Sequence, residues 1–215
     1  MPEKKIADLR EDYRLHTLDI SDVADDPIEQ FKTWFEAAQE AKVPEPNAMT
    51  LATATADGIP SARIVLLKGF YEDGFVFYTN YESDKGREMD ANPHAALVFC
   101  WLGLERQVRI SGAVQRLPED ESLAYFQSRP KGSQIGAWAS PQSQIISDRQ
   151  ILEDNVRRLQ EEYASADQLP RPPHWGGYVV KADQIEFWQG RSSRLHDRIR
   201  YQKEGGGWKK ERLAP

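Results

Sequence analysis

The feature that most constrains the fold is a succession of short apolar segments rich in β-branched residues, each bounded by turn residues. Residues 49–55 and 59–68 flank an Ala-Asp-Gly turn and predict a β-hairpin. Further short strands are expected at 75–79, 95–102, 105–115, 175–182, 184–190 and 194–201, which gives about eight, and a last one follows at 208–213. Few helices fall between them, so strands and helices do not alternate as a doubly wound sheet requires. The sequence therefore predicts a mainly β protein with peripheral helices (α+β), built on an antiparallel barrel.

Helix-start signals mark the expected helices. These signals are an Asp-Pro pair at 26–27, Ser83, Pro118, and a capping box of Ser147 with Gln150. The first helix carries an apolar stripe that includes Phe31 and Trp34. The segment GSQIGAWAS at 132–140 is rich in small residues and is assigned no element.

Length and composition favour one domain. A chain of 215 residues with 40% hydrophobic residues is long enough to bury a substantial core. Residues 1–26 are polar and acidic, so we expect a mobile N-terminal arm followed by a single domain over 27–215.

Charge and apolar runs exclude several classes of protein. The formal charge of −6 argues against general nucleic-acid binding, which requires a basic excess. The apolar run around Cys100 is too short to span a membrane, and the N-terminal residues have no apolar signal core. With one cysteine and no secretion motif, we expect a cytoplasmic protein that binds neither nucleic acid nor membrane.

The segment DQIEFWQGRSSRLHDRIRY at 183–201 concentrates cations and aromatic residues. A strand over 194–201 places Arg194, His196 and Arg198 on one face, near Trp188. Such a wall suits an anionic, partly aromatic ligand. A solvated edge strand explains the same charges, and periodicity alone leaves both interpretations open.

Two further regions carry cations. In a regular strand Arg63 and Lys68 point to opposite faces about 17 Å apart, so they are expected to serve different anions unless both are charges at strand ends. The helix that starts at Ser83 presents free backbone N–H groups, and Lys85 adds positive charge to this possible phosphate site.

Motifs of the common nucleotide and metal enzymes are absent from the sequence. It contains no phosphate-loop signature, no GxGxxG, no paired-cysteine motif and no HExxH. The four histidines are dispersed, so no metal site is expected. The residues alone leave two interpretations, a site for a phosphorylated aromatic ligand or a barrel without one.

Several longer motifs occur together and in order. They are RIVLLK at 63–68, FYTNYESDKG at 77–86, ERQVRISG at 105–112, FQSRPKGSQIGAWAS at 126–140, PPHWGGY at 172–178, EFWQGRSSRLHDR at 186–198 and RLAP at 212–215. In these motifs the chain resembles the pyridoxamine 5′-phosphate oxidase family. The resemblance implies an FMN-binding split β-barrel that works as a homodimer, with FMN at the subunit interface and each site drawing on both chains.

The resemblance also implies roles for individual residues. FMN would be bound by Arg63, Ile64, Val65, Leu66, Leu67, Lys68, Tyr78, Thr79, Lys85, Gln107, Gln142, Ser143, Trp188 and Arg198. Substrate would be bound by Arg10, Tyr13, Lys68, Tyr125, Arg129, Ser133, Arg194, Leu195 and His196. Arg194 and His196 are the expected catalytic residues, acting by positioning the pyridine end of the substrate.

The implied reaction is oxidation of pyridoxamine or pyridoxine 5′-phosphate to pyridoxal 5′-phosphate, with hydride passing to FMN and O2 as acceptor giving H2O2. The alternatives are a non-catalytic flavin or pyridoxal-phosphate binding protein and a flavin reductase on the same barrel. One departure concerns Asp84, which stands where the family often has a basic residue. An acid there weakens phosphate binding unless it faces away or caps the helix.

Overall fold

The computed structural model describes residues 5–9, 11–72 and 74–215, and the chain divides into two compact units. The first comprises Met1–Met49, Leu97–Ile110 and Ala182–Pro215, and the second comprises Thr50–Ala96 and Ser111–Lys181. The predicted domain boundaries, with a mobile arm over 1–26, stay a prediction.

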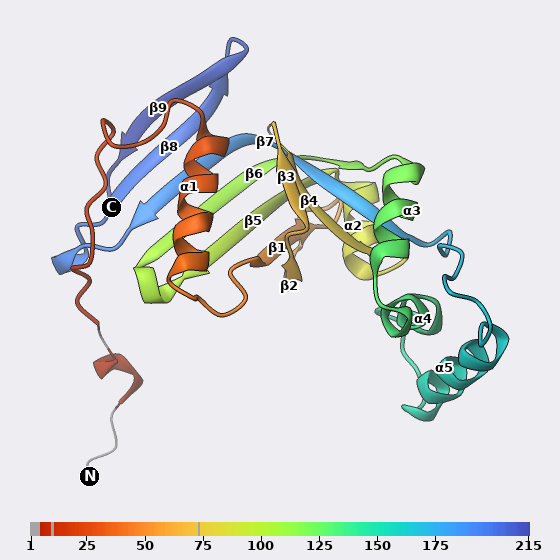
Figure 1. Cartoon of the computed structure of the whole chain (residues 1–215). Coiled ribbons are helices and arrows are strands. Elements are labelled where there is room, and N and C mark those ends of the chain that lie inside the picture. Colours follow the sequence, from red (N-terminus) through yellow and green to blue (C-terminus); the bar gives the residue numbers. More distant parts are fainter. Residues whose placement is uncertain (1–4, 10, 73) are drawn as a thin grey trace. The chain divides into compact units, whose positions relative to one another are not determined.

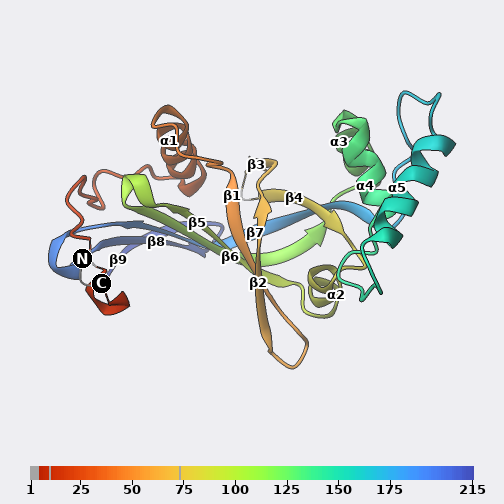
Figure 2. The same cartoon turned by 90° about the horizontal axis from the view of Figure 1, so that it is seen from below.

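Nine strands in the described part of the chain form one sheet (Figures 1 and 2). They are β1 Ala48–Ala54, β2 Pro60–Leu66, β3 Gly69–Tyr71, β4 Gly74–Asn80, β5 His94–Trp101, β6 Arg106–Arg116, β7 Trp175–Gln189, β8 Asp197–Glu204 and β9 Gly207–Leu213. The strand order is β2-β1-β5-β6-β7-β4-β3, and β8 pairs with both β7 and β9. The ladders β3–β4, β4–β7, β7–β8 and β8–β9 are antiparallel.

The helices lie between strands in the sequence without a regular alternation. They are α1 Pro27–Glu40, α2 Asp84–Ala91, α3 Glu119–Ser128, α4 Lys131–Ala139 and α5 Gln150–Glu162, with 3-10 turns η1 Ile6–Asp8, η2 Leu102–Leu104 and η3 Ser192–Arg194. The prediction of a mainly antiparallel β protein with peripheral helices is confirmed. No helix among residues 5–9, 11–72 and 74–215 is long and apolar enough to cross a membrane.

Several predicted boundaries are wrong. The segments predicted as two strands at 175–182 and 184–190 form the single strand β7. The strand predicted at 194–201 is β8, which begins at Asp197. The small-residue segment folds as α4, and the N-cap of α5 is Arg149, so the predicted capping box of Ser147 does not form.

In the first unit, α1 packs on the sheet through aromatic side chains. The Asp26 carboxylate accepts hydrogen bonds from the backbone N–H groups of Ile28 and Glu29, which satisfies donors that a helix start leaves free. The Phe31 ring lies 5.0 Å from that of Phe99 on β5, and the Trp34 ring lies 5.2 Å from that of Phe187 on β7. The helix is thereby fixed by burial of its apolar face.

In the second unit, β4 pairs with the first half of β7, and α3, α4 and α5 lie near one another (Figure 2). These helices contribute side chains to a common apolar cluster. The cluster consists of Phe126 from α3, Ile135 and Ala139 from α4, Leu159 from α5, and the buried residues Leu169 and Trp175. This packing sets α3 and α4 in place for the cavity described below.

Gly177 on β7 has no room for a side chain. A Cβ atom there would lie 2.5 Å from Cδ1 of Leu117 and 2.8 Å from Cε1 of Tyr78. We expect Gly177→Ala to lower the free energy of unfolding by about 1–3 kcal/mol through overpacking, measured by urea denaturation. Gly132→Ala is the matched control because an added Cβ meets nothing within 4 Å there. Equal stability of the two variants would refute the steric argument.

Candidate functional site

The second unit contains a cavity of about 680 Å³. Its lining residues are Arg63, Ile64, Val65, Leu66, Lys68, Tyr78, Thr79, Asn80, Lys85, Tyr125, Arg129, Pro130, Ser133, Gly136, Ala137, Ser140, Gln142 and Trp175. They come from β2, β4, α2, α3, α4 and the start of β7, together with the segments that follow β2, α3 and α4. The volume falls within the range of roughly 300–1,000 Å³ of ligand and cofactor sites.

Lys85 reaches the cavity from the first turn of α2. Ser83 caps this helix, and its hydroxyl accepts hydrogen bonds from the N–H of Gly86 and from Nζ of Lys85. The Lys85 ammonium also donates to Oε1 of Gln142 at 3.1 Å. Burial, followed by the nearby charge of Arg63, holds the pKa of Lys85 below its ordinary value. An anion in the cavity would relieve both effects.

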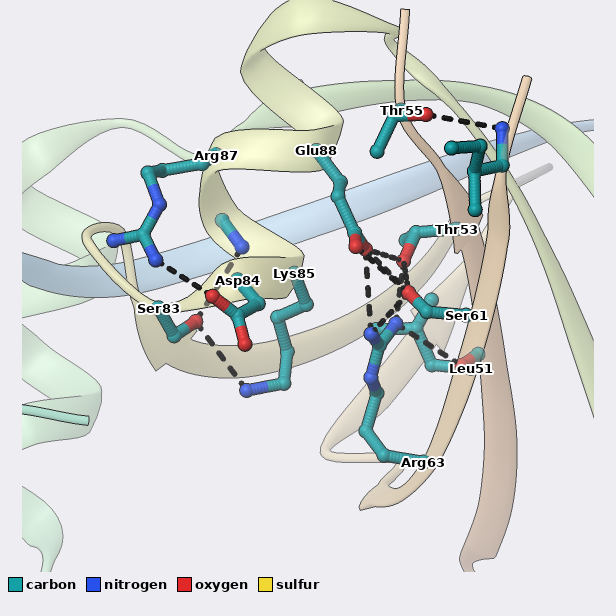
Figure 3. Close-up of polar contacts among 12 residues, drawn as sticks. Leu51, Thr53, Thr55, Ser61, Arg63, Ser83, Asp84, Lys85, Arg87 and Glu88 are labelled. Atoms are coloured by element: carbon teal, nitrogen blue, oxygen red, sulfur yellow. Dashed lines mark hydrogen bonds and ion pairs between the residues drawn. The ribbon is translucent and has the colours of Figure 1, made fainter. Parts of the chain in front are cut away.

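Arg63 on β2 is held by a network of polar groups (Figure 3). Its guanidinium donates to the hydroxyl of Ser61 at 2.6 Å, to the Glu88 carboxylate at 3.3 Å, and to the hydroxyl of Thr53. Arg63 and Lys85 are called the cation pair below. Arg63 and Lys68 do not lie on opposite faces of one strand as predicted, because β2 ends at Leu66 and both side chains line the same cavity. That the two residues bind different anions stays a prediction.

Aromatic rings and a half-buried cation form another part of the wall. Tyr78 and Tyr125 stack at 3.8 Å with an interplanar angle of 19°, and Trp175 stacks on Tyr78 at 5.5 Å. The Arg129 guanidinium lies 4.6 Å from the centre of the Trp175 ring. Its NH1 atom is buried and has no hydrogen-bond partner among the described residues. A buried unpaired donor on a cation is costly unless a ligand satisfies it.

The hydroxyl of Tyr78 in the cavity wall stays protonated at neutral pH. Burial, with a smaller contribution from the negative charge of Glu121, raises the pKa of Tyr78 to about 12. Tyr78 therefore offers the cavity a neutral hydroxyl at neutral pH.

Asp84 does not line the cavity. Its carboxylate accepts a hydrogen bond of 2.6 Å from Arg87, and both side chains are exposed (Figure 3). The unusual acid at this position thus lies outside the cavity lining, and its charge is balanced by Arg87.

A second group of predicted residues lies in the first unit. Trp188 and His196 lie 4.5 Å apart between ring centres, and Tyr13 lies 5.9 Å from Trp188 and 6.0 Å from His196. Nδ1 of His196 accepts a hydrogen bond of 3.1 Å from the backbone N–H of Arg191. Burial, followed by the charge of Arg194, holds the pKa of His196 below its ordinary value. The ring is therefore neutral at pH 7, with its proton on Nε2.

The predicted strand face of Arg194, His196 and Arg198 does not exist. Ser193 and Arg194 have φ angles of 57° and 62°, and β8 starts only at Asp197. Arg198 instead donates two hydrogen bonds, of 2.8 and 3.1 Å, to the carboxylate of the buried Glu186 on β7. This pairing fixes Arg198 opposite Trp188, its register partner on β7.

Asp197 ties the N-terminal segment to this group. Its carboxylate accepts hydrogen bonds from the Leu18 backbone N–H at 3.1 Å, from Arg191 at 2.9 Å and from Arg212 at 3.0 Å. Burial alone would raise its pKa, but the hydrogen bonds from Leu18, Arg191 and Arg212 outweigh burial and lower it. Asp197, which shares no face with His196 in the expected strand, thus acquires a structural role.

Asp197→Asn is expected to loosen residues 13–18 and to lower stability, because Arg191 and Arg212 lose an ionised partner. The folded-state pKa is depressed, so the contribution of Asp197 is complete above the unfolded-state pKa of about 3.9 and disappears as pH falls below it. Urea unfolding should show a difference from the parent protein that is constant near pH 7 and shrinks below about pH 4.

Hydrogen exchange at the Leu18 amide checks the local effect of Asp197→Asn. We expect faster exchange there than in the parent chain. Asp167→Asn, at an exposed position of the other unit, serves as control. Unchanged exchange at Leu18 would show that Asp197 does not hold the segment.

Most predicted residues fall into one of these two groups. All the predicted cofactor and substrate residues of the second unit line the cavity except Leu67, which is buried in the core, and Ser143, an exposed residue with φ of 67°. Gln107 is half-buried on β6, and Leu195 is 69% exposed. Arg10 lies outside the described residues. The sequence interpretation missed Trp175 and the small residues of α4 as part of the cavity wall. For the residues of α4, the run of Gly, Ala and Ser at 132–140 was the available signal.

Two family models match the chain. One, described as pyridoxamine 5′-phosphate oxidase, matches residues 35–163, and the other, described as the pyridoxine 5′-phosphate oxidase C-terminal dimerisation region, matches residues 175–215. The second match supports a homodimer. The chain is 59% identical to the pyridoxine/pyridoxamine 5′-phosphate oxidase of Salinibacter ruber, covering 98% of this chain and 99% of the relative. It is 56% identical to that of Acaryochloris marina, covering 99% and 97%.

Solved structures show the same fold. PhzG from Burkholderia lata 383, in complex with tetrahydrophenazine-1-carboxylic acid, aligns with a TM-score of 0.87 and 34% identity over 94% of this chain and 99% of PhzG. A pyridoxamine 5′-phosphate oxidase-related, FMN-binding protein from Nostoc punctiforme aligns with a TM-score of 0.66 and 19% identity over 86% and 96%. The second likeness bears on the fold alone. The prediction of a split β-barrel is confirmed.

Proposed function

The chain belongs to the pyridoxamine 5′-phosphate oxidase family and is an oxidoreductase, and from this premise we propose that it oxidises pyridoxamine 5′-phosphate and pyridoxine 5′-phosphate to pyridoxal 5′-phosphate with FMN. O2 is the proposed acceptor and H2O2 the second product. The enzyme works as a homodimer in which each site draws on both chains. Its location in the cytoplasm stays a prediction.

The observation that carries the substrate proposal is the buried NH1 atom of Arg129, which has no hydrogen-bond partner in the described part of the chain. Ser133, Tyr125 and Lys68 line the same cavity. A phosphate ester would accept from Arg129 and Ser133 and balance the charge of Lys68. The planar rings of Tyr125 and Trp175 suit the aromatic part of such a ligand.

The residues of the cavity also fit FMN. The cation pair and the Ser83-capped start of α2 provide the charge and donors that a second phosphate needs. Gln142 accepts from both Thr79 and Lys85, so its amide is fixed beside the ammonium. Bound FMN would supply the redox chemistry, accepting hydride from C4′ of the substrate and passing electrons to O2.

Arg194 and His196 are proposed to position the pyridine end of the substrate. The neutral His196 ring keeps a donor on Nε2, and its tilted packing against Trp188, with ring centres 4.5 Å apart, limits its rotation. Arg194 adds positive charge in an exposed turn that precedes β8 and has positive φ angles at Ser193 and Arg194. Both residues act by orientation, so no proton transfer is assigned to His196.

The test is an oxygen-electrode and peroxide assay of the FMN-loaded protein with each substrate. We expect O2 consumption and H2O2 release with at least one of the two phosphates. FMN-loaded protein that is inert to both substrates would overturn the proposal.

The same FMN-loaded protein distinguishes the oxidase from the two alternative functions. Tight flavin or pyridoxal-phosphate binding without peroxide would indicate a non-catalytic binding protein. Rapid anaerobic bleaching of the flavin by a nicotinamide donor would indicate a flavin reductase.

A further inference from the structure

Glu88 on α2 contacts Arg63 of the cation pair without lining the cavity itself (Figure 3). We propose that Glu88 is a positioning residue that fixes Arg63 for the phosphate of FMN. The inference rests on the proposed function and assigns a role to a residue of α2 beyond the ligand-contacting set.

The contacts of Arg63 restrict it to one orientation. A guanidinium has five N–H groups. NH1 donates to the Leu51 carbonyl at 3.4 Å and to the Thr53 hydroxyl, and NH2 donates to Ser61 and Glu88. These contacts account for four of the five N–H groups, so the side chain is held before any ligand arrives. An ordered side chain loses less conformational entropy on binding a phosphate.

Glu88 also orients the two hydroxyls that hold Arg63. The Ser61 hydroxyl donates to Glu88 at 2.7 Å, and the Thr53 hydroxyl donates to the same oxygen, Oε2. Each hydroxyl has a single proton, so donation to Glu88 turns its lone pairs toward Arg63. Glu88 is thus the acceptor that organises the whole network.

The ionised state of Glu88 is secured by the same contacts. Burial would raise its pKa, but the hydrogen bonds from Thr53 and Ser61 and the charge of Arg63 outweigh burial and lower it. The Glu88 side chain is only 14% exposed. Glu88 is therefore an anion at neutral pH beside the proposed binding site of another anion.

Because Glu88 is negatively charged, a purely electrostatic role and a positioning role predict opposite changes in phosphate binding when Glu88 is removed. If Glu88 acted only through its charge, its removal would make the cavity more positive and would tighten phosphate binding. If Glu88 positions Arg63, its removal frees the guanidinium and weakens phosphate binding. Riboflavin separates the phosphate from the ring system because it carries the same rings without the phosphate.

The experiment titrates flavin-free protein with FMN and with riboflavin, following flavin fluorescence. We expect Glu88→Ala to weaken FMN binding about 10-fold, by analogy with other residues that orient ligand-binding groups, and to leave riboflavin affinity unchanged. Glu88→Gln keeps an oxygen that accepts from both hydroxyls, so it should restore FMN affinity to within about 3-fold of the parent protein. Glu82→Gln, at an exposed position before α2, is the control.

Each other result has a defined meaning. Tighter FMN binding by Glu88→Ala, unchanged FMN binding, or equal weakening for FMN and riboflavin would overturn the positioning role. If Glu88→Ala does not fold, Ser61→Ala takes its place in the experiment. We expect Ser61→Ala to weaken the binding of FMN and to leave the binding of riboflavin unchanged. Equal effects on both flavins would contradict the positioning role. If the parent protein binds riboflavin as tightly as FMN, the proposed phosphate site itself fails, whatever Glu88 does.

Discussion

Arg129→Ala should lower kcat/KM for pyridoxamine 5′-phosphate by roughly 100-fold, since a hydrogen bond to a charged group contributes about 1.5–3 kcal/mol. The buried NH1 atom of Arg129 has no partner among the residues that the structure describes, so in the proposed complex its partner is the substrate phosphate. The effect should fall mainly on KM, because the phosphate is remote from the oxidised carbon. Steady-state peroxide assays measure it.

Pyridoxamine without phosphate provides the control for Arg129. Its slow oxidation should be the same in Arg129→Ala and the parent enzyme, because no phosphate is present to be bound. Arg129→Lys keeps the charge but loses the planar fork, so it should recover only part of the loss. If both substrates lose activity equally, Arg129 maintains the structure of the wall instead of binding phosphate.

Arg194→Ala should lower turnover by about 100-fold or more while leaving FMN bound, and Arg63→Ala should release FMN. The two arginines lie in different units and have different surroundings: Arg194 is exposed, whereas Arg63 is held by Ser61 and Glu88 beside Lys85. The ratio of flavin to protein absorbance after gel filtration measures occupancy, and peroxide release at saturating FMN measures turnover.

Arg63→Ala and Arg194→Ala serve as controls for each other. Turnover of Arg63→Ala should recover when FMN is added in excess, whereas Arg194→Ala should not respond. Equal flavin loss in the two variants would contradict the proposed division between cofactor and substrate residues.

Local sequence signals predicted a large part of this site. The Ser83 cap, Lys85 in the first turn and the hairpin that carries Arg63 all depend on residues close in sequence, and the structure contains each of them. Tyr125 and Arg129 were expected to bind substrate; Tyr125 lies on α3, Arg129 is the C-cap residue of this helix, and both line the cavity.

The missed features depend on distant contacts or on unusual backbone angles. Glu88 meets Thr53 and Ser61 across 35 and 27 residues, and no short pattern indicates such pairings. The strand predicted from 194 failed because Ser193 and Arg194 adopt positive φ angles, which alternation of side chains does not reveal. Trp175 joined the wall because β7 is continuous and pairs with β4, which brings Trp175 opposite Asn80.

The depressed pKa of Lys85 couples ligand binding to protons. Burial and the charge of Arg63 make the ammonium of Lys85 less stable in the free protein than in water, whereas a bound phosphate dianion stabilises it. Binding at alkaline pH is therefore accompanied by proton uptake, and affinity declines as pH rises through the depressed pKa. In the proposed complex, the cation pair therefore holds a phosphorylated cofactor less tightly on the alkaline side of the Lys85 titration than below it.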